Sequence, residues 1–165
     1  MEPGEILSTA AQIAVALAGF AGVVVVFRRE SVHDWSPIDK FRLRLLLTNS
    51  VLPLALSTVG LLLLSIKPEP PGIWRWSSGF AFVVLLPFGI ERLKIFSRFD
   101  QQELRSSHAT RFVFYLSAAL GIGATLLQLY NAAFLGAFWP FFTGIVVQLI
   151  AAMFQFARII LVPPK

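Results

Sequence analysis

The sequence predicts an all-α fold, a polytopic transmembrane bundle of about five membrane-spanning helices. Three observations predict it: 56% of the 165 residues are hydrophobic, only 14% are charged, and the charges leave long uncharged runs. A soluble domain usually holds about 45–50% apolar and about 25% charged residues, so this composition excludes the ordinary soluble classes. The sequence contains no cysteine, which excludes disulfide scaffolds, thiolate zinc sites and cysteine nucleophiles.

The first two predicted spans are uncharged runs of membrane-crossing length. The run from Leu7 to Phe27 has 21 residues and the run from Leu45 to Ile66 has 22. A hydrocarbon core of roughly 30 Å needs about 20 residues at 1.5 Å each. Residues 7–27 read as a retained helix rather than a cleaved signal peptide, because the preceding tail is acidic and the run ends at two arginines.

The third predicted span, residues 73–95, has a shorter apolar centre. Only 15 uncharged residues separate Arg75 from Glu91. A helix can still cross here if its flanking basic and tryptophan side chains lie at the two interfaces, where long cations reach water.

The last apolar stretch is too long for one crossing. From Phe112 to Ala157 there are 46 uncharged residues, interrupted near Gly136 and Pro140. Glycine and proline interrupt helices, so the stretch predicts two spans, 112–132 and 138–161, joined by a tight turn. All five spans are expected to form a single transmembrane domain, residues 1–165.

The distribution of basic residues predicts the orientation. With five crossings, 12 of the 14 lysines and arginines fall on one side. Because cytoplasmic loops are enriched in basic residues, the amino terminus is expected outside and the carboxyl terminus in the cytoplasm. The 12 residues are Arg28, Arg29, Lys40, Arg42, Arg44, Arg92, Lys94, Arg98, Arg105, Arg111, Arg158 and Lys165.

Small residues in the first span form a candidate helix-packing face. They recur at four-residue intervals, at Ala10, Ala14, Ala18 and Gly22. A ribbon of small residues lets another helix approach closely, and in lipid that packing drives association. Its partner is either another helix of the same chain or a second subunit.

A candidate kink and polar site lies in the second span. Pro53 cannot donate a hydrogen bond to the carbonyl of Asn49, so the helix is expected to open there beside Ser50. A carbonyl exposed beside an amide can coordinate an ion or water, although Ser50 or a neighbouring helix can also satisfy it.

Glu91 and Arg158 form a candidate intramembrane ion pair. Each lies about one turn inside the cytoplasmic end of an apolar segment, where an unpaired charge is costly. We expect them to face each other, or Glu91 to pair with Arg42 or Arg44. The pair is expected to be structural, with proton or ion handling as the alternative.

Patterns for catalysis, cofactors and metals are absent from the sequence. It contains no glycine-rich phosphate loop, no Gly-x-Ser-x-Gly elbow and no His-Glu-x-x-His helix, and the predicted spans contain no aspartate. His33 and His108 have no second ligand at metal spacing. An enzyme, a cofactor, a metal and a nucleic-acid partner are therefore not expected, since topology accounts for the net charge of +5.

The first ninety residues resemble a group of small uncharacterised bacterial integral membrane proteins. The resemblance rests on the apolar run Ala16–Arg28, on Trp35, on Phe41–Arg44 and on Trp74–Ser78. It implies a bacterial inner membrane, and it brings no activity, cofactor or catalytic residue.

Two functions are expected from these patterns. The first is a structural, sensor or effector subunit that acts through helix–helix contacts, with membrane lipid and either further copies or another membrane protein as partners. The alternative is a homo-oligomeric ion channel or small transporter, whose path the amides of the spans would line, namely Asn49, Gln128, Gln148 and Gln155.

Overall fold

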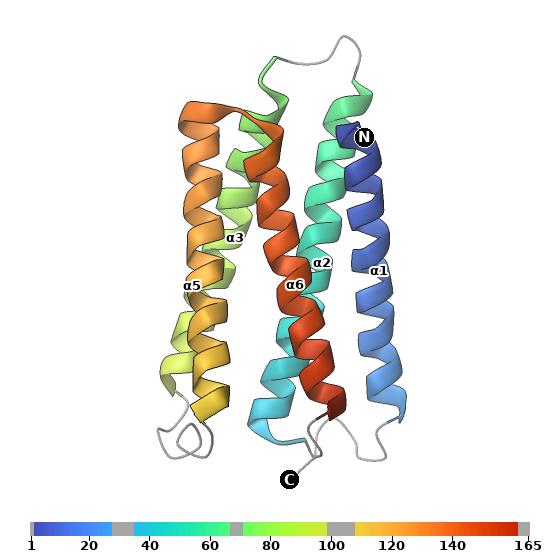
Figure 1. Cartoon of the computed structure of the whole chain (residues 1–165), viewed down its shortest axis with the longest axis vertical. Coiled ribbons are helices and arrows are strands. Elements are labelled where there is room, and N and C mark those ends of the chain that lie inside the picture. The colour runs from blue at the N-terminus through green and yellow to red at the C-terminus, as the bar shows by residue number, and fades with distance from the viewer. Residues whose placement is uncertain (1, 28–34, 67–70, 99–107, 162–165) are drawn as a thin grey trace. The chain divides into compact units, whose positions relative to one another are not determined.

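Every described element of the chain is a helix (Figure 1). The computed structural model describes residues 2–27, 35–66, 71–98 and 108–161. Five long α-helices follow one another, with one short π-helical segment, η2, after the fourth. The elements are α1 (Pro3–Phe27), α2 (Pro37–Ser65), α3 (Ile73–Arg98), α5 (His108–Tyr130), η2 (Asn131–Leu135) and α6 (Phe138–Leu161).

All five helices are long and apolar enough to cross a membrane. The predicted fold class is therefore confirmed, and the chain is a multi-pass membrane protein. The candidate spans are Pro3–Val26, Asp39–Ser65, Ile73–Glu91, Tyr115–Leu135 and Phe138–Ile160.

The helices group into two compact units. Unit 1 comprises residues 1–70 and 145–165, so it contains α1, α2 and most of α6. Unit 2 comprises residues 71–144, so it contains α3, α5, η2 and the first residues of α6. The expected single domain stays a prediction.

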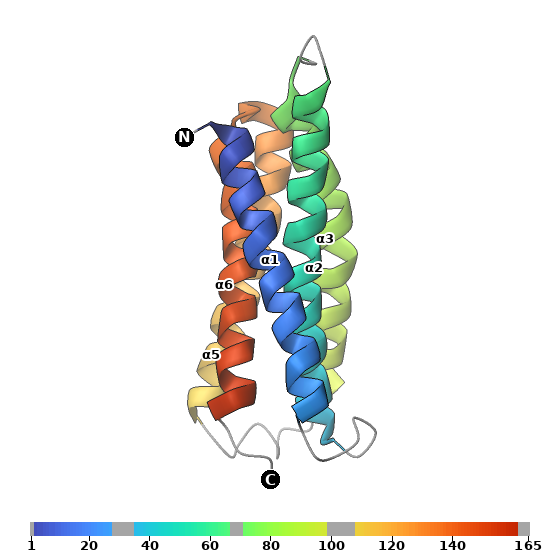
Figure 2. The same cartoon turned by 90° about the vertical axis from the view of Figure 1, so that its right-hand side faces the viewer.

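In unit 1, α1 packs along α2, as both ribbon views show (Figures 1 and 2). The helix α2 starts at a good cap: the Ser36 hydroxyl accepts a hydrogen bond from the backbone N–H of Asp39, and Pro37 occupies the first turn. The rings of Phe20 on α1 and Phe156 on α6 lie 5.3 Å apart, centroid to centroid. This ring contact joins α1 to α6 within unit 1.

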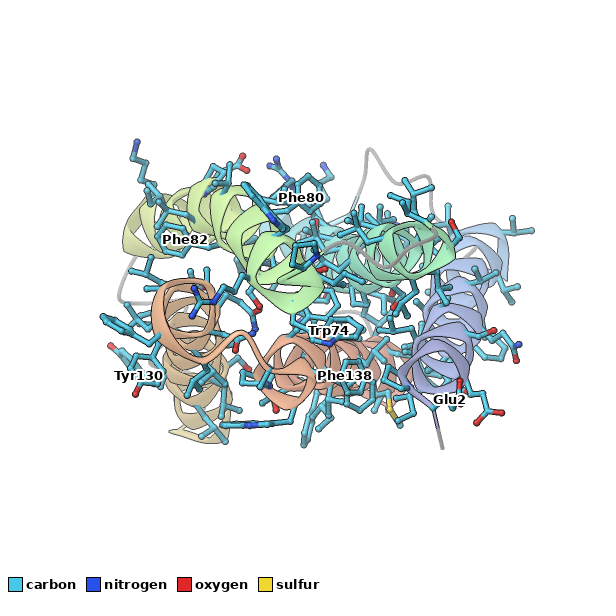
Figure 3. All side chains as sticks on the ribbon, turned by 90° about the horizontal axis from the view of Figure 1, so that it is seen from above. Glu2, Trp74, Phe80, Phe82, Tyr130 and Phe138 are labelled. Carbon is cyan, nitrogen blue, oxygen red and sulfur yellow. The ribbon has the colours of Figure 1, made fainter. Side chains whose placement is uncertain are left out.

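In unit 2, an aromatic cluster joins the start of α3 to the start of α6. The indole of Trp74 lies 4.8 Å from the ring of Phe138 and 5.9 Å from that of Phe141, centroid to centroid (Figure 3). Phe141 is fully buried. Both helices therefore begin at the same end of the unit.

Candidate functional site

The predicted packing face of α1 is only partly buried. Ala10 and Ala14 are buried, Ala18 is half-buried and Gly22 is exposed, with nothing within 4 Å of a Cβ added there. A four-residue step advances about 40° beyond one full turn, so such a ribbon winds away from a straight contact line. The buried line instead follows Leu7, Ala10, Ala14, Leu17 and Ala21, which alternate three- and four-residue steps.

The predicted kink site lies in the buried part of α2. Asn49, Ser50 and Pro53 are all buried, and the helix continues through Pro53 to Ser65. The Ser50 hydroxyl donates a hydrogen bond to the carbonyl of Leu46, one turn earlier, over 2.8 Å. It does not donate to the carbonyl of Asn49, which Pro53 leaves without its helical N–H donor. An ion or water role for this site stays a prediction.

The charges of the predicted ion pair belong to different units. Glu91 is half-buried on α3 in unit 2, whereas Arg158 is half-buried on α6 in unit 1. A bond between Glu91 and Arg158, or between Glu91 and either Arg42 or Arg44, would join the two units, and it stays a prediction. Within unit 1, Arg42 forms an ion pair with Asp39, its Nη1 lying 3.1 Å from Oδ1.

Several side-chain hydrogen bonds lie together where α5 turns into α6, and three of them involve Asn131. Its fully buried amide nitrogen donates to the Ser78 hydroxyl over 2.7 Å and to the carbonyl of Ala137 over 2.9 Å. Its amide oxygen accepts from the backbone N–H of Ala137, also over 2.9 Å. One side chain thus holds the turn closed and ties it to α3.

Gln128 forms a second contact, one turn before Asn131. Its amide nitrogen donates to the carbonyl of Pro140 over 2.8 Å, and the side chain is fully buried. Gly144 makes room for this amide, because a Cβ at Gly144 would lie 2.5 Å from Gln128 Nε2. The glycine therefore lets α5 and α6 approach at this point.

The turn itself is a π-helical segment that ends at a glycine. Gly136 has φ of 63°, the left-handed conformation that glycine adopts without a steric penalty. The Arg75 side chain crosses this glycine and its Nη2 donates to the carbonyl of Phe134 over 3.3 Å. A Cβ on Gly136 would lie 3.0 Å from the Arg75 side chain, so two constraints favour glycine here.

Asn131 lies inside the predicted span 112–132, and the sequence pattern did not identify its role. A usable signal was an amide five residues before a glycine, at the end of an apolar run, because such an amide can bond the backbone of the turn. The partner Ser78 lies 53 residues earlier, so no local pattern indicates it.

The neutral amides and hydroxyls around Asn131 can hold backbone in place, but they offer no nucleophile beside a base. Within the described ranges, no three histidine, aspartate or glutamate side chains come together as metal ligands would. Comparison of the chain with protein-family models, with curated proteins and with solved structures finds no match. The fold defines the class, a five-helix membrane protein, in which the buried amides of Gln128 and Asn131 bond other helices of unit 2.

Proposed function

We propose that this is a non-enzymatic protein of the bacterial inner membrane that acts through helix–helix contacts, as a structural, sensor or effector subunit. The observation that carries the proposal is that the buried amides of Asn131 and Gln128 form hydrogen bonds to other helical segments. Asn131 bonds the α5–α6 turn and α3, and Gln128 bonds the start of α6, so both side chains support helix packing. In lipid, interhelical hydrogen bonds contribute to helix association together with van der Waals packing.

Large apolar faces of α1 and α5 support a partner in the membrane. Of the 18-residue apolar part of each span, only 22% is buried in α1 and only 17% in α5. These faces can meet lipid, further copies of the chain or another membrane protein. Their exposed residues include Ile13, Val15, Phe20 and Val23 on α1, and Leu116, Leu120, Ile122 and Leu126 on α5.

Photocrosslinking in native membranes tests the proposal. A benzoylphenylalanine placed at each exposed position of α1 and α5 should form protein adducts whose yields recur with helical spacing on one face. Buried Leu17 serves as the control, because a probe there faces its own unit. Lipid adducts alone at every exposed position would contradict the proposal.

The proposed orientation is an amino terminus outside and a carboxyl terminus in the cytoplasm. Its support is the basic residues of the connections. The chain lacks cysteine, so two single replacements on α2 give a matched pair, Ser36→Cys and Ser65→Cys. A membrane-impermeant maleimide added to intact spheroplasts should label the second variant and not the first, and the reverse pattern would invert the topology.

The alternative is a homo-oligomeric channel or small transporter, which one observation in unit 1 favours. Gln148 and Gln155 are buried seven residues apart on α6, so they share one face. The amide oxygen of Gln155 and the hydroxyl of Ser57 are buried without a hydrogen-bond partner among the described residues. Ion flux through liposomes separates this alternative from the leading proposal.

A further inference from the structure

One amide of the membrane-spanning helices is exposed. The described spans contain six asparagine and glutamine side chains, of which five are buried. The sixth, Gln12 on α1, is exposed, and no other described residue forms a hydrogen bond with its side chain. The chain thus packs its other span amides inside and leaves this one at its surface. The buried five are Asn49, Gln128, Asn131, Gln148 and Gln155.

Gln12 lies near the middle of the membrane. It is the tenth residue of the 24-residue span Pro3–Val26, so at 1.5 Å per residue it lies about 14 Å from the start of that span. A hydrocarbon core is about 30 Å thick, which places the amide near its centre. Acyl chains offer no hydrogen bond, so an amide without a partner is costly at this depth. The position of Gln12 therefore favours contact with a further protein chain.

The residues around Gln12 leave room for a close neighbour. A helix turns about 100° per residue, so Thr9, Ala16 and Gly19 lie within about 60° of Gln12 on one side of α1. These four residues are all exposed and form what we term the Gln12 face, where nothing lies within 4 Å of a Cβ added at Gly19. The buried line of α1 lies about 140° or more away, at Leu7, Ala10, Ala14, Leu17 and Ala21.

A second copy of the chain fits the Gln12 face better than a different protein does. An amide carries two N–H donors and an acceptor oxygen, so two amides can satisfy each other. Two copies with the same orientation bring their Gln12 side chains to the same depth, and a twofold axis along the membrane normal sets them opposite each other. A different protein would need a polar group of its own at that depth. The small residues Ala16 and Gly19 let two backbones approach closely.

We propose that two copies of this chain pair in the membrane through the Gln12 face of α1, with the two Gln12 amides hydrogen-bonded to each other. The inference rests on the proposed role in helix–helix contacts, and it names the partner. In the pair the two α1 helices run parallel, and the buried side of each α1 stays within its own unit 1.

Disulfide formation in native membranes tests the face, because the chain has no cysteine of its own. Oxidation should link Ala16→Cys and Gly19→Cys chains into dimers, since a twofold axis sets each position near its own copy. Two differently tagged copies identify the product as chain linked to chain. Ile13→Cys is the control, because Ile13 is also exposed but lies about 100° around the helix from Gln12. Equal dimer yields at Ile13 and Gly19 contradict the proposal.

A second measurement tests the amide itself. Energy transfer between donor-labelled and acceptor-labelled full chains in liposomes gives the dissociation constant of the pair. Gln12→Leu loses two hydrogen bonds, so the constant should rise about eightfold. Gln12→Asn keeps an amide and should pair more tightly than Gln12→Leu, whereas Gly19→Leu keeps Gln12 and blocks the approach of the backbones. Ile13→Ala is the control and should pair like the wild type.

The outcomes separate this inference from the proposed function. Equal pairing of the wild type, Gln12→Leu and Gly19→Leu overturns the role of the Gln12 face. A chain that stays monomeric, but whose α1 forms photocrosslinked adducts with another membrane protein, overturns the pairing and leaves the proposed function standing. Lipid adducts alone would overturn both.

Discussion

Asn131 donates its side-chain amide to the hydroxyl of Ser78 over 2.7 Å, and both side chains are fully buried. The two residues lie on η2 and α3, 53 positions apart in sequence. Because the same amide also bonds the backbone of Ala137, one residue couples the α5–α6 turn to a third helix. This contact therefore joins η2 to α3 within unit 2.

Replacing Asn131 with leucine should destabilise the protein. The variant keeps the approximate volume and loses three hydrogen bonds. At about 0.6 kcal/mol for each polar contact in a membrane protein, the loss should be about 2 kcal/mol. Unfolding in mixed detergent micelles measures it. Thr143→Val is the control, since that hydroxyl bonds the Trp139 carbonyl of its own helix, and a similar loss there would refute the special role of Asn131.

Gly144→Ala should be costly because of one neighbour, Gln128. The new methyl would displace the Gln128 amide from the Pro140 carbonyl, and overpacking of this kind costs about 1–3 kcal/mol. In a Gln128→Ala background the same substitution should cost much less, since the obstructing amide is gone. A double-mutant cycle measures the difference, and additive costs would show that the two residues do not interact.

Gly136→Ala should also destabilise the protein, for a backbone reason. An L-residue in the left-handed conformation costs about 1–2 kcal/mol, and the added methyl would press on Arg75. Gly123→Ala is the matched control, because that glycine is helical, exposed and has nothing within 4 Å of an added Cβ. Thermal unfolding should show a lower midpoint for the first variant and an unchanged or higher one for the second. Equal midpoints for the two variants would show that the protein's stability does not require glycine at position 136.

Asp39→Asn should weaken unit 1. It removes the charge that faces Arg42, which is buried, and the loss should be about 2 kcal/mol. The cap of α2 is unaffected, because Asp39 contributes its backbone N–H to Ser36. Glu5→Gln, an exposed replacement in α1, should leave stability unchanged. If both variants unfold alike, the Asp39–Arg42 pair does not stabilise the fold.

Much of the fold could be predicted, because lipid forces charges out of the spans. Four uncharged stretches locate five helices, because the last stretch is long enough for two and is broken near Gly136, where η2 ends. Helix ends were less predictable. The second span was expected from residue 45, yet α2 begins at Pro37, since its charged first turns are helical without lying in the apolar core. Absence of charge marks the crossing part of a helix, not the whole helix.

The polar sites were harder to predict from sequence. The four-residue pattern on α1 identified Ala10 and Ala14, but helical geometry exposes Gly22. The partnership of Asn131 with Ser78 and the close approach of Gln128 to Gly144 depend on how helices pack, and no short spacing encodes them. A residue type suggests which bonds a side chain can make, whereas the fold decides its partner.

Ion flux through proteoliposomes tests the central claim most directly, namely that the polar side chains of the spans bind helices together and do not line a path. The full chain is reconstituted and the leak of potassium and chloride is compared with that of protein-free liposomes. The proposal predicts equal leak rates. A faster, ion-selective leak that falls in Gln148→Leu and Gln155→Leu, and persists in Thr143→Val, whose hydroxyl bonds its own helix, would contradict it and establish the channel.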